Sequence, residues 1–509
     1  MISVHGSSLE GIDRTSELYK RLENFHLRLA KKDLTIWGAK ASKEAEKRLN
    51  WIQAPTSSKA LLPELADLLK KFSGLTHIVL CGMGGSSLAP EVFAKSFNKE
   101  LFVLDSTDPA YIAHTEGFDL TKTLVIVSSK SGSTLETVAA RNYFASRFMA
   151  EKLDPVAHML FVTDPDSALD KQARKEGFTV VNADPFIGGR FSALSAFGLV
   201  PAVLMNINVE KVLDDAESAI ADFLQHPQAI IDSAYVLING AKQFIEFSDA
   251  NSKLPGMSDW IEQLIAESTG KDSKGRLPIA VDSYSKLDDV LTVSFANEAQ
   301  LNVQGELGEH FIFWEWITAL IAASLEVDAF NQPNVTEAKE LTSVLLQEWD
   351  NSLPELHPDA DEDGVEIFGD GVTLTSALKN LIMNTDSDGY IAVMAYLDRA
   401  SESRVAELQR ILSEKSGRPV TFGWGPRFLH STGQFHKGGQ PNGSFLQITG
   451  NTEHDIKIPE MNFDFKTLLA AQAIGDGRAL ASRKYPLLRL NLINRSAGIE
   501  AVISAAQSI

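Results

Sequence analysis

The stretch from Thr123 to Thr137, TLVIVSSKSGSTLET, constrains the fold most, because a short turn of hydroxyl residues joins an apolar run to a helical pattern. Thr123 to Val127 are apolar or β-branched and predict a buried strand, and an amphipathic helix is expected from Leu135. The turn leaves backbone N–H groups at a helix N-terminus, where the helix dipole favours negative charge. The stretch therefore predicts either a phosphate site or a loop whose hydroxyls only cap the helix.

The same alternation of strand and helix continues on both sides of this stretch and in two later regions. It is typical of parallel sheets covered by helices on both faces, with ligands at the carboxyl ends of the strands. A helix is expected over residues 229–247. Strands are expected near residues 76–81, 101–105, 123–127, 158–163, 178–182, 277–281, 290–295, 389–396, 419–424 and 444–448.

We therefore expect an α/β protein with two doubly wound parallel-sheet domains and a third α/β domain. Its 509 residues are too many for one core. The expected segments are a helical amino-terminal arm at 1–74, sheet domains at 75–210 and 211–345, and a carboxyl-terminal α/β domain at 346–509.

The net charge and the cysteine content indicate which partners and which cellular compartment to expect. A net charge of -20 argues against a surface for nucleic acid or anionic membrane. The single cysteine, Cys81, allows no intrachain disulfide, and the first 30 residues lack the apolar core of a signal peptide. Phe311 to Val327 is apolar but is interrupted by Glu315, so we expect a buried helix in a cytoplasmic protein.

A glycine turn, Cys81 to Ser87, ends the first expected strand. Gly82, Gly84 and the later Asp105 have the spacing of a dinucleotide fingerprint, but Ser87 stands at the third glycine position. With the serine-rich turn and Lys130 at a neighbouring strand end, the pattern favours a pocket for one phosphate over a track for a pyrophosphate.

The strings GMGGSSLAP and SSKSGSTLET together resemble the sugar isomerase (SIS) domain, in particular the glucose-6-phosphate isomerase family. The resemblance implies flavodoxin-like SIS domains. Gly132 stands where most members carry a bulkier residue, which predicts a more mobile loop. By this resemblance the substrate phosphate is held by Gly85, Ser86, Ser129, Lys130, Ser131 and Thr134.

Two further segments supply the expected catalytic groups. Gly188-Gly189-Arg190 alone is compatible with a surface arginine, but it is similar to an isomerase signature whose arginine stabilises an enediolate. Gln263 and Glu267 lie four residues apart and hence on one helix face. Their segment QLIAESTG resembles the isomerase segment that supplies the general base, which implies that role for Glu267 with Gln263 beside it.

The sugar ring is expected to be opened by two later residues. Gly308-Glu309-His310 is similar to the glycine, glutamine, histidine signature of the isomerases, with Glu309 in place of the glutamine. By that resemblance His310 assists ring opening, although a lone histidine at a helix start is commonly a cap or a core residue. The string FNQPNV before Lys339 resembles a late isomerase motif with Asn331 in place of aspartate, which implies a lysine near the ring oxygen.

The glycine-rich region from Gly423 to Gly443 contains two histidines and two basic residues: Arg427, His430, His436 and Lys437. No metal site is expected, because no carboxylate or cysteine stands at a ligand spacing from the histidines. Its LHSTGQ and HKGG strings resemble the carboxyl-terminal part of isomerases that are fused to transaldolase in some bacteria. A structural or partner-binding role is expected for this region.

Taken together, the resemblance implies reversible conversion of glucose 6-phosphate into fructose 6-phosphate without a metal or organic cofactor. The expected partners are a phosphosugar and a second copy of the chain in a homodimer. Binding to nucleic acid or to a membrane is not expected. Two alternatives stay open: an isomerase of another phosphosugar such as mannose 6-phosphate, and a non-catalytic phosphosugar-binding regulator. A dehydrogenase is a more distant third.

Overall fold

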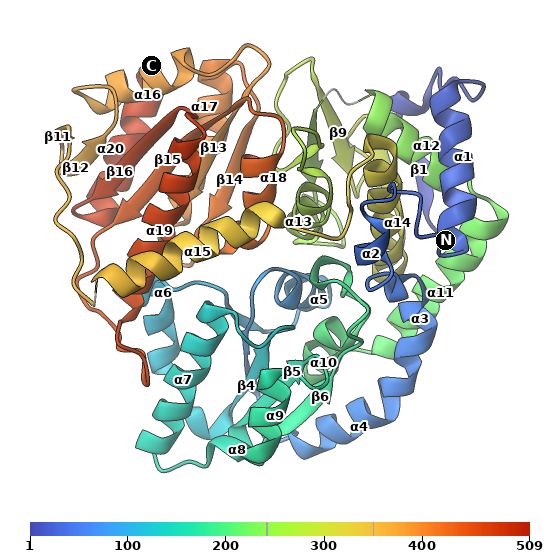
Figure 1. Ribbon diagram of the computed structural model, residues 1–509, viewed down its shortest axis with the longest axis horizontal. Coiled ribbons are helices and arrows are strands. Elements are labelled where there is room, and N and C mark those ends of the chain that lie inside the picture. Colours follow the sequence, from blue (N-terminus) through green and yellow to red (C-terminus); the bar gives the residue numbers. More distant parts are fainter. Residues whose placement is uncertain (241–242, 350) are drawn as a thin grey trace. The chain divides into compact units, whose positions relative to one another are not determined.

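The computed structural model describes residues 1–240, 243–349 and 351–509, and the chain divides into two compact units (Figure 1). The first unit comprises Met1–Asp105, Phe118–Tyr284 and Asp289–Asn331. The second comprises Ser106–Gly117, Ser285–Asp288 and Gln332–Ile509. The segment boundaries expected at residues 74, 210 and 345 stay predictions.

The first sheet of the first unit is parallel throughout and has the strand order β3-β2-β4-β5-β6. All five strands expected in this region are present. This order places β2 beside β4 while the chain continues from them to opposite sides, which is the flavodoxin-like switch point where ligands bind. The bounds are β2 His77–Cys81, β3 Phe102–Leu104, β4 Thr123–Ser128, β5 Met159–Thr163 and β6 Thr179–Asn182.

The second sheet has the order β1-β10-β9-β7-β8, with β1 antiparallel and the other strands parallel. Two predictions were wrong here. The amino-terminal arm contributes a strand, β1, and the helix expected over 229–247 ends early, because its last residues form β7; residues 241–242 within it lie outside the described residues. The bounds are β1 Ser3–His5, β7 Phe244–Ser248, β8 Leu277–Ala280, β9 Val290–Ser294 and β10 Leu301–Gln304.

Both sheets of the first unit share one hydrophobic core with the helices around them. The helix α14 (Leu307–Leu325) is buried over almost its whole length, as expected for residues 311–327. No helix among the described residues is long and apolar enough to cross a membrane. The other helices of this unit are α1 Glu17–Ala30, α2 Ser42–Ala45, α3 Ala54–Ser57, α4 Leu62–Lys71, α5 Leu88–Ser96, α7 Leu135–Ala150, α8 Pro155–His158, α9 Ala168–Lys175, α10 Ala196–Leu204, α11 Val209–Gln225, α12 Gln228–Tyr235 and α13 Met257–Thr269.

The second unit is built on a six-stranded sheet with the order β11-β12-β16-β15-β13-β14, in which β16, β15, β13 and β14 are parallel. The third α/β region is thus confirmed. Its strands are β11 Ala360–Glu362, β12 Val365–Phe368, β13 Tyr390–Ala395, β14 Val420–Trp424, β15 Gly443–Gly450 and β16 Leu487–Leu492. Its main helices are α15 Pro333–Trp349, α16 Leu374–Met383, α17 Glu407–Ser416, α18 Gly433–Gly438, α19 Phe465–Ser482 and α20 Arg495–Gln507.

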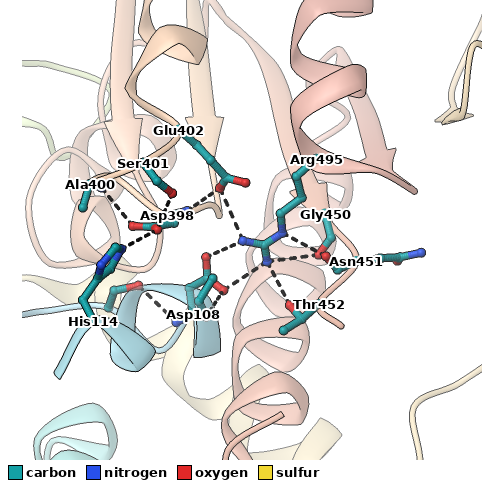
Figure 2. A network of polar contacts seen from close by, with 12 residues as sticks. Asp108, His114, Asp398, Ala400, Ser401, Glu402, Gly450, Asn451, Thr452 and Arg495 are labelled. Atoms are coloured by element: carbon teal, nitrogen blue, oxygen red, sulfur yellow. Dashed lines mark hydrogen bonds and ion pairs between the residues drawn. The ribbon is translucent and has the colours of Figure 1, made fainter. Parts of the chain in front are cut away.

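A short segment that the chain inserts between β3 and β4, residues 106–117, belongs to this second unit and contains α6 (Pro109–Ala113). Figure 2 shows how its side chains are held: the Arg495 guanidinium donates to both carboxylate oxygens of Asp108, at 2.7 and 3.0 Å. The ring of His114 contacts the Asp398 carboxylate at 2.7 Å. Because Asp108 is fully buried, its charge depends on this arginine.

Candidate active site

Two helices start directly after neighbouring strands of the first sheet, and neither start is capped by its own side chain. The N-cap residues Ser87 of α5 and Thr134 of α7 make no side-chain capping bond. By contrast, Ser167 caps α9 by accepting from the backbone N–H of Asp170. The first-turn N–H groups of α5 and α7 therefore remain suited to an external anion.

The glycine turn after β2 packs directly on the backbone of the arginine segment. A Cβ atom at Gly85 would lie 2.0 Å from the carbonyl oxygen of Gly189, so only glycine allows this contact. The Ser192 hydroxyl also donates to the Gly85 carbonyl at 3.3 Å. The packing brings the segment with Ser86 beside the segment with Arg190, as the predicted site requires.

The serine-rich loop after β4 is held by its own hydroxyls. Ser129 Oγ accepts from the Gly132 backbone N–H at 3.1 Å, and Ser131 Oγ accepts from Ser133 at 3.3 Å. Gly132 has a φ of +74°, and a Cβ atom there would lie 2.4 Å from that of Leu169. Close packing on α9 and a left-handed backbone thus account for this glycine; the expected greater mobility of the loop stays a prediction.

The ammonium group of Lys130 is held by acceptors of the chain itself. Its Nζ donates to Asp164 Oδ2 at 2.7 Å and to the Pro185 carbonyl at 3.2 Å. Burial lowers the pKa of Lys130, and the neighbouring Asp164 carboxylate opposes that shift. Lys130 thus braces the loop, and its contact with the substrate phosphate stays a prediction.

Glu267 and Arg190 meet in the interior of the first unit. Arg190 Nη1 lies 3.2 Å from Glu267 Oε1, and Gln263 Nε2 donates to Glu267 Oε2 at 3.1 Å. The predicted adjacency of Gln263 and Glu267 is therefore confirmed, and Glu267 is only 8% exposed. A buried carboxylate that is held on both oxygens is oriented like a general base, and the arginine beside it can stabilise developing negative charge.

Arg190 is fixed by further donors and acceptors around it. Its Nε donates to the Ser268 hydroxyl at 2.8 Å, and Nη2 donates to the carbonyls of Ala329 at 2.7 Å and Asn331 at 3.1 Å. Burial lowers the pKa of Arg190, while the Glu267 charge raises it. The guanidinium is thus pre-oriented by bonds that need no bound substrate.

Sequence reasoning missed a second buried cation at this site. Lys271 Nζ donates to the Asn331 carbonyl at 2.5 Å and also to the carbonyl of Asp328. Burial, followed by the charge of Arg190, lowers the pKa of Lys271 well below its usual value. Lys271 directly follows the segment QLIAESTG, so its position in sequence was a usable signal. Two cations therefore hold the turn at residues 328–331 by its carbonyl groups.

His310, one of the predicted catalytic residues, is enclosed in the interior of the first unit. Its side chain is 0% exposed, and neither ring nitrogen has a hydrogen-bond partner among the described residues. Its ring packs edge-on against Phe295 at 5.5 Å between centroids, and burial lowers its pKa to about 3. The ring of His310 is therefore enclosed in the core of the folded chain, and its role in ring opening stays a prediction.

The residues around His310 have structural tasks that explain the short motif. A Cβ atom at Gly308 would lie 2.0 Å from the Val212 carbonyl on α11, so this glycine permits close helix packing. Glu309 closes a capping box with Glu306 at the start of α14. The other expected ring-opening residue, Lys339, lies exposed on α15 in the second unit.

The comparison of structures finds solved structures that share the fold. The crystal structure of a glucose-6-phosphate isomerase from Chlamydia trachomatis superposes with a TM-score of 0.52 at 18% sequence identity. The alignment covers 70% of this chain and 90% of that chain. This likeness, with the parallel sheets described above, confirms the α/β fold class with doubly wound parallel sheets.

Sequence comparison finds curated proteins named glucose-6-phosphate isomerase. That of Campylobacter jejuni is 32% identical over 237 residues, which are 43% of this chain and 58% of the relative. That of Methanocaldococcus jannaschii is 27% identical over 266 residues, which are 48% of this chain and 66% of the relative. The chain thus spans less than two thirds of the length of either relative. Residues 69–276, which include Arg190, Gln263 and Glu267, match the family model described as Phosphoglucose isomerase.

Proposed function

We propose that this chain catalyses the reversible isomerisation of glucose 6-phosphate and fructose 6-phosphate. The observation that carries the proposal is the buried Glu267 carboxylate, held by Gln263 at 3.1 Å and by Arg190 at 3.2 Å. Relatives of that name match the part of the chain that supplies these residues. A non-catalytic regulator that only binds a phosphosugar has no need for a buried base paired with a buried arginine.

In the proposed reaction Glu267 removes the proton from carbon 2 and returns it to carbon 1. The negative charge that develops on the enediolate oxygen is stabilised by the guanidinium of Arg190. The substrate phosphate binds at the starts of α5 and α7, and this remote contact positions the reacting carbons. The residues proposed to hold it are Gly85, Ser86, Ser129, Lys130, Ser131 and Thr134. Ring opening is proposed for His310 and Lys339, as the sequence resemblance implies.

The finer predictions on assembly and origin remain part of this proposal. We propose a homodimer, as the sequence resemblance implies, and a cytoplasmic location, as expected from the amino-terminal sequence and the apolar segment at 311–327. The carboxyl-terminal region with the LHSTGQ and HKGG strings is proposed to correspond to that of isomerases fused to transaldolase. Resident metal or organic cofactors have no task in this reaction, because the proton is carried by a side chain.

The test is a coupled assay of the purified full chain with fructose 6-phosphate, run beside mannose 6-phosphate at equal concentration. We expect turnover of fructose 6-phosphate to be at least about tenfold faster, corresponding to about 1.4 kcal/mol of discrimination. Faster turnover of mannose 6-phosphate would transfer the proposal to that substrate. Tight binding of both sugars with no turnover of either would make the chain a regulator, and binding of a nicotinamide cofactor would favour the dehydrogenase.

A further inference from the structure

The turn at residues 328–331, which follows α14, is closed by its own aspartate. Asp328 Oδ1 accepts hydrogen bonds from the backbone N–H groups of Phe330 at 2.8 Å and Asn331 at 3.2 Å. These N–H groups are thus used within the turn. Its backbone carbonyl groups instead accept hydrogen bonds from the two buried cations described above.

The carbonyl group of Asn331 is shared by the two cations. It accepts from Lys271 Nζ at 2.5 Å and from Arg190 Nη2 at 3.1 Å. Lys271 also donates to the Asp328 carbonyl, and Arg190 Nη2 donates to that of Ala329 at 2.7 Å. Both of these acceptors of Nη2 belong to the turn that Lys271 holds, so a displacement of the turn also displaces the guanidinium.

Aromatic packing holds the turn independently of Lys271. The centroid of the Phe330 ring lies 4.8 Å from that of Trp37 and 5.6 Å from that of Phe191. Phe191 directly follows Arg190 in the chain. The turn should therefore stay folded against the arginine segment when Lys271 is replaced, and only the direction of its carbonyl groups should become less restricted.

A lysine buried beside an arginine is unfavourable for the stability of the fold. Lys271 is 3% exposed, and burial, followed by the charge of Arg190, lowers its pKa well below the usual value. In the second unit the comparably buried Lys437 has a carboxylate partner, Asp476, and both of those side chains are at most 1% exposed. The hydrogen bonds of Lys271 run to carbonyl oxygens, which compensate a positive charge less than a carboxylate does. Such a lysine beside a proposed base and its arginine indicates a task in the reaction.

We propose that Lys271 is a positioning residue that orients the Arg190 guanidinium for the enediolate by holding the carbonyl groups of the turn at residues 328–331. This inference rests on the proposed isomerase function and on the role assigned there to Arg190. A preorganised donor must lie about 2.7–3.1 Å from the oxygen on which charge develops, so a small change in its direction reduces the stabilisation. Lys271 itself then needs no contact with the substrate.

The kinetic test compares Lys271→Met with the matched variant Lys274→Met, in the same loop between α13 and β8. Lys274 Nζ donates to the carbonyl of Leu325, the last residue of α14, at 2.9 Å, so this control removes a similar bond just before the turn. For Lys271→Met we expect kcat to fall about 10- to 100-fold, with KM for fructose 6-phosphate changed less than about threefold. Lys274→Met should keep kcat within about twofold. An unchanged kcat in Lys271→Met would overturn the proposal.

A double-mutant cycle tests whether Lys271 and Arg190 act as a unit. If Lys271 acts through the guanidinium, then Lys271→Met should lower kcat less than about twofold further when Arg190 is already replaced by glutamine. Equal losses of kcat with and without the guanidinium would exclude positioning of Arg190 as the task of Lys271.

Inhibition separates the direction of the guanidinium from general damage to the site. A phosphorylated hydroxamate carries planar anionic oxygens that imitate the enediolate, and its inhibition constant should rise about 10- to 100-fold in Lys271→Met. The inhibition constant of inorganic phosphate, which is proposed to bind at the starts of α5 and α7, should change less than about twofold. An equal loss for both inhibitors, or for neither, would contradict the proposal.

Hydrogen exchange supplies a readout that does not depend on catalysis. The backbone amides of Phe330 and Asn331, which donate to Asp328, should exchange at least about tenfold faster in Lys271→Met than in Lys274→Met. Equal exchange in the two variants would show that Lys271 does not order the turn, whatever the kinetics show. If the unmodified chain does not turn over fructose 6-phosphate, the proposed function itself fails; if it does and Lys271→Met is kinetically normal, only this inference fails.

Discussion

Replacing Glu267 by glutamine tests the proposed base with almost no change in shape. The side chain is 8% exposed and accepts from Gln263 and Arg190, so the amide can still occupy the same volume but cannot take up the substrate proton. Loss of a positioned general base costs about 10²- to 10⁴-fold in rate. We therefore expect kcat to fall by about 10³, or about 4 kcal/mol of transition-state stabilisation.

The same change also removes the carboxylate that faces two buried cations, Arg190 and Lys271. Breaking a buried ion pair by removing one partner costs about 3–5 kcal/mol of stability, and retained volume reduces that cost toward the lower value. The urea midpoint should therefore fall measurably while the fold is kept. Isothermal titration should still show fructose 6-phosphate binding within about threefold of the unmodified affinity, since the phosphate contacts are elsewhere.

The neighbouring Glu262 provides the matched control on the same helix. It is also 8% exposed, and its Oε1 accepts from the Ala280 backbone N–H at 3.3 Å. Glu262→Gln should keep kcat within about threefold. The reasoning is refuted if Glu267→Gln retains more than about a tenth of the original kcat, or if Glu262→Gln loses as much.

Three further predictions concern the phosphate loop, the second unit and acid stability. Gly132→Ala, at φ +74° with Leu169 2.4 Å from the added atom, should weaken competitive inhibition by inorganic phosphate about tenfold. The control is Gly177→Ala, at φ +85° with no neighbour within 4 Å, which adds only the backbone strain of about 1 kcal/mol. It should leave the inhibition constant of phosphate unchanged, and an equal loss of inhibition in both variants would contradict the steric argument. Lys437→Met should lower the free energy of unfolding by about 3–5 kcal/mol in urea titrations, and adding Asp476→Leu should recover part of it; a double variant no more stable than the single one counts against the pair. Burial lowers the pKa of His310 from 6.5 to about 3, so the unfolded chain binds this proton at higher pH than the folded chain. The contribution of His310 to the free energy of unfolding is fully present above pH 6.5 and is lost as pH falls toward 3, by about 1.4 kcal/mol at pH 5.5. The urea midpoint of His310→Leu should therefore fall less between about pH 7.5 and 5.5 than that of the unmodified chain. An identical fall in both proteins would exclude His310 as the cause.

The first sheet could be predicted because parallel strands covered on both faces are continuous apolar runs. The strand β7 could not, because Glu246 and Ser248 interrupt its apolar run, although Phe244–Ser248 is buried at every position. The strand β16 alternates buried and half-buried residues along LLRLNL, but it is only six residues long. Period alone does not separate such short segments from helix.

The site could be predicted where a side chain meets a side chain, as Glu267 meets Arg190. The hydrogen bonds from Lys271 to the turn at residues 328–331 could not be predicted, because the acceptors are backbone carbonyl groups, which any residue supplies. The prediction for His310 relied on three residues, of which Gly308 and Glu309 have packing and capping tasks. A match so short does not distinguish a reactive histidine from one enclosed in a core.

The inserted segment 106–117 makes the second unit impossible to obtain by cutting the chain once. A fragment that begins at Gln332 would contain Arg495 and Asp398 but would lack Asp108 and His114, which pair with them. Proteolytic cleavage after Asn331 would preserve these pairs as long as the two fragments stay associated. Expression of either fragment alone would leave one member of a buried ion pair without its partner. The two units are therefore expected to evolve together. A recombination event that exchanges the carboxyl-terminal half must also supply a compatible segment 106–117 within the amino-terminal half.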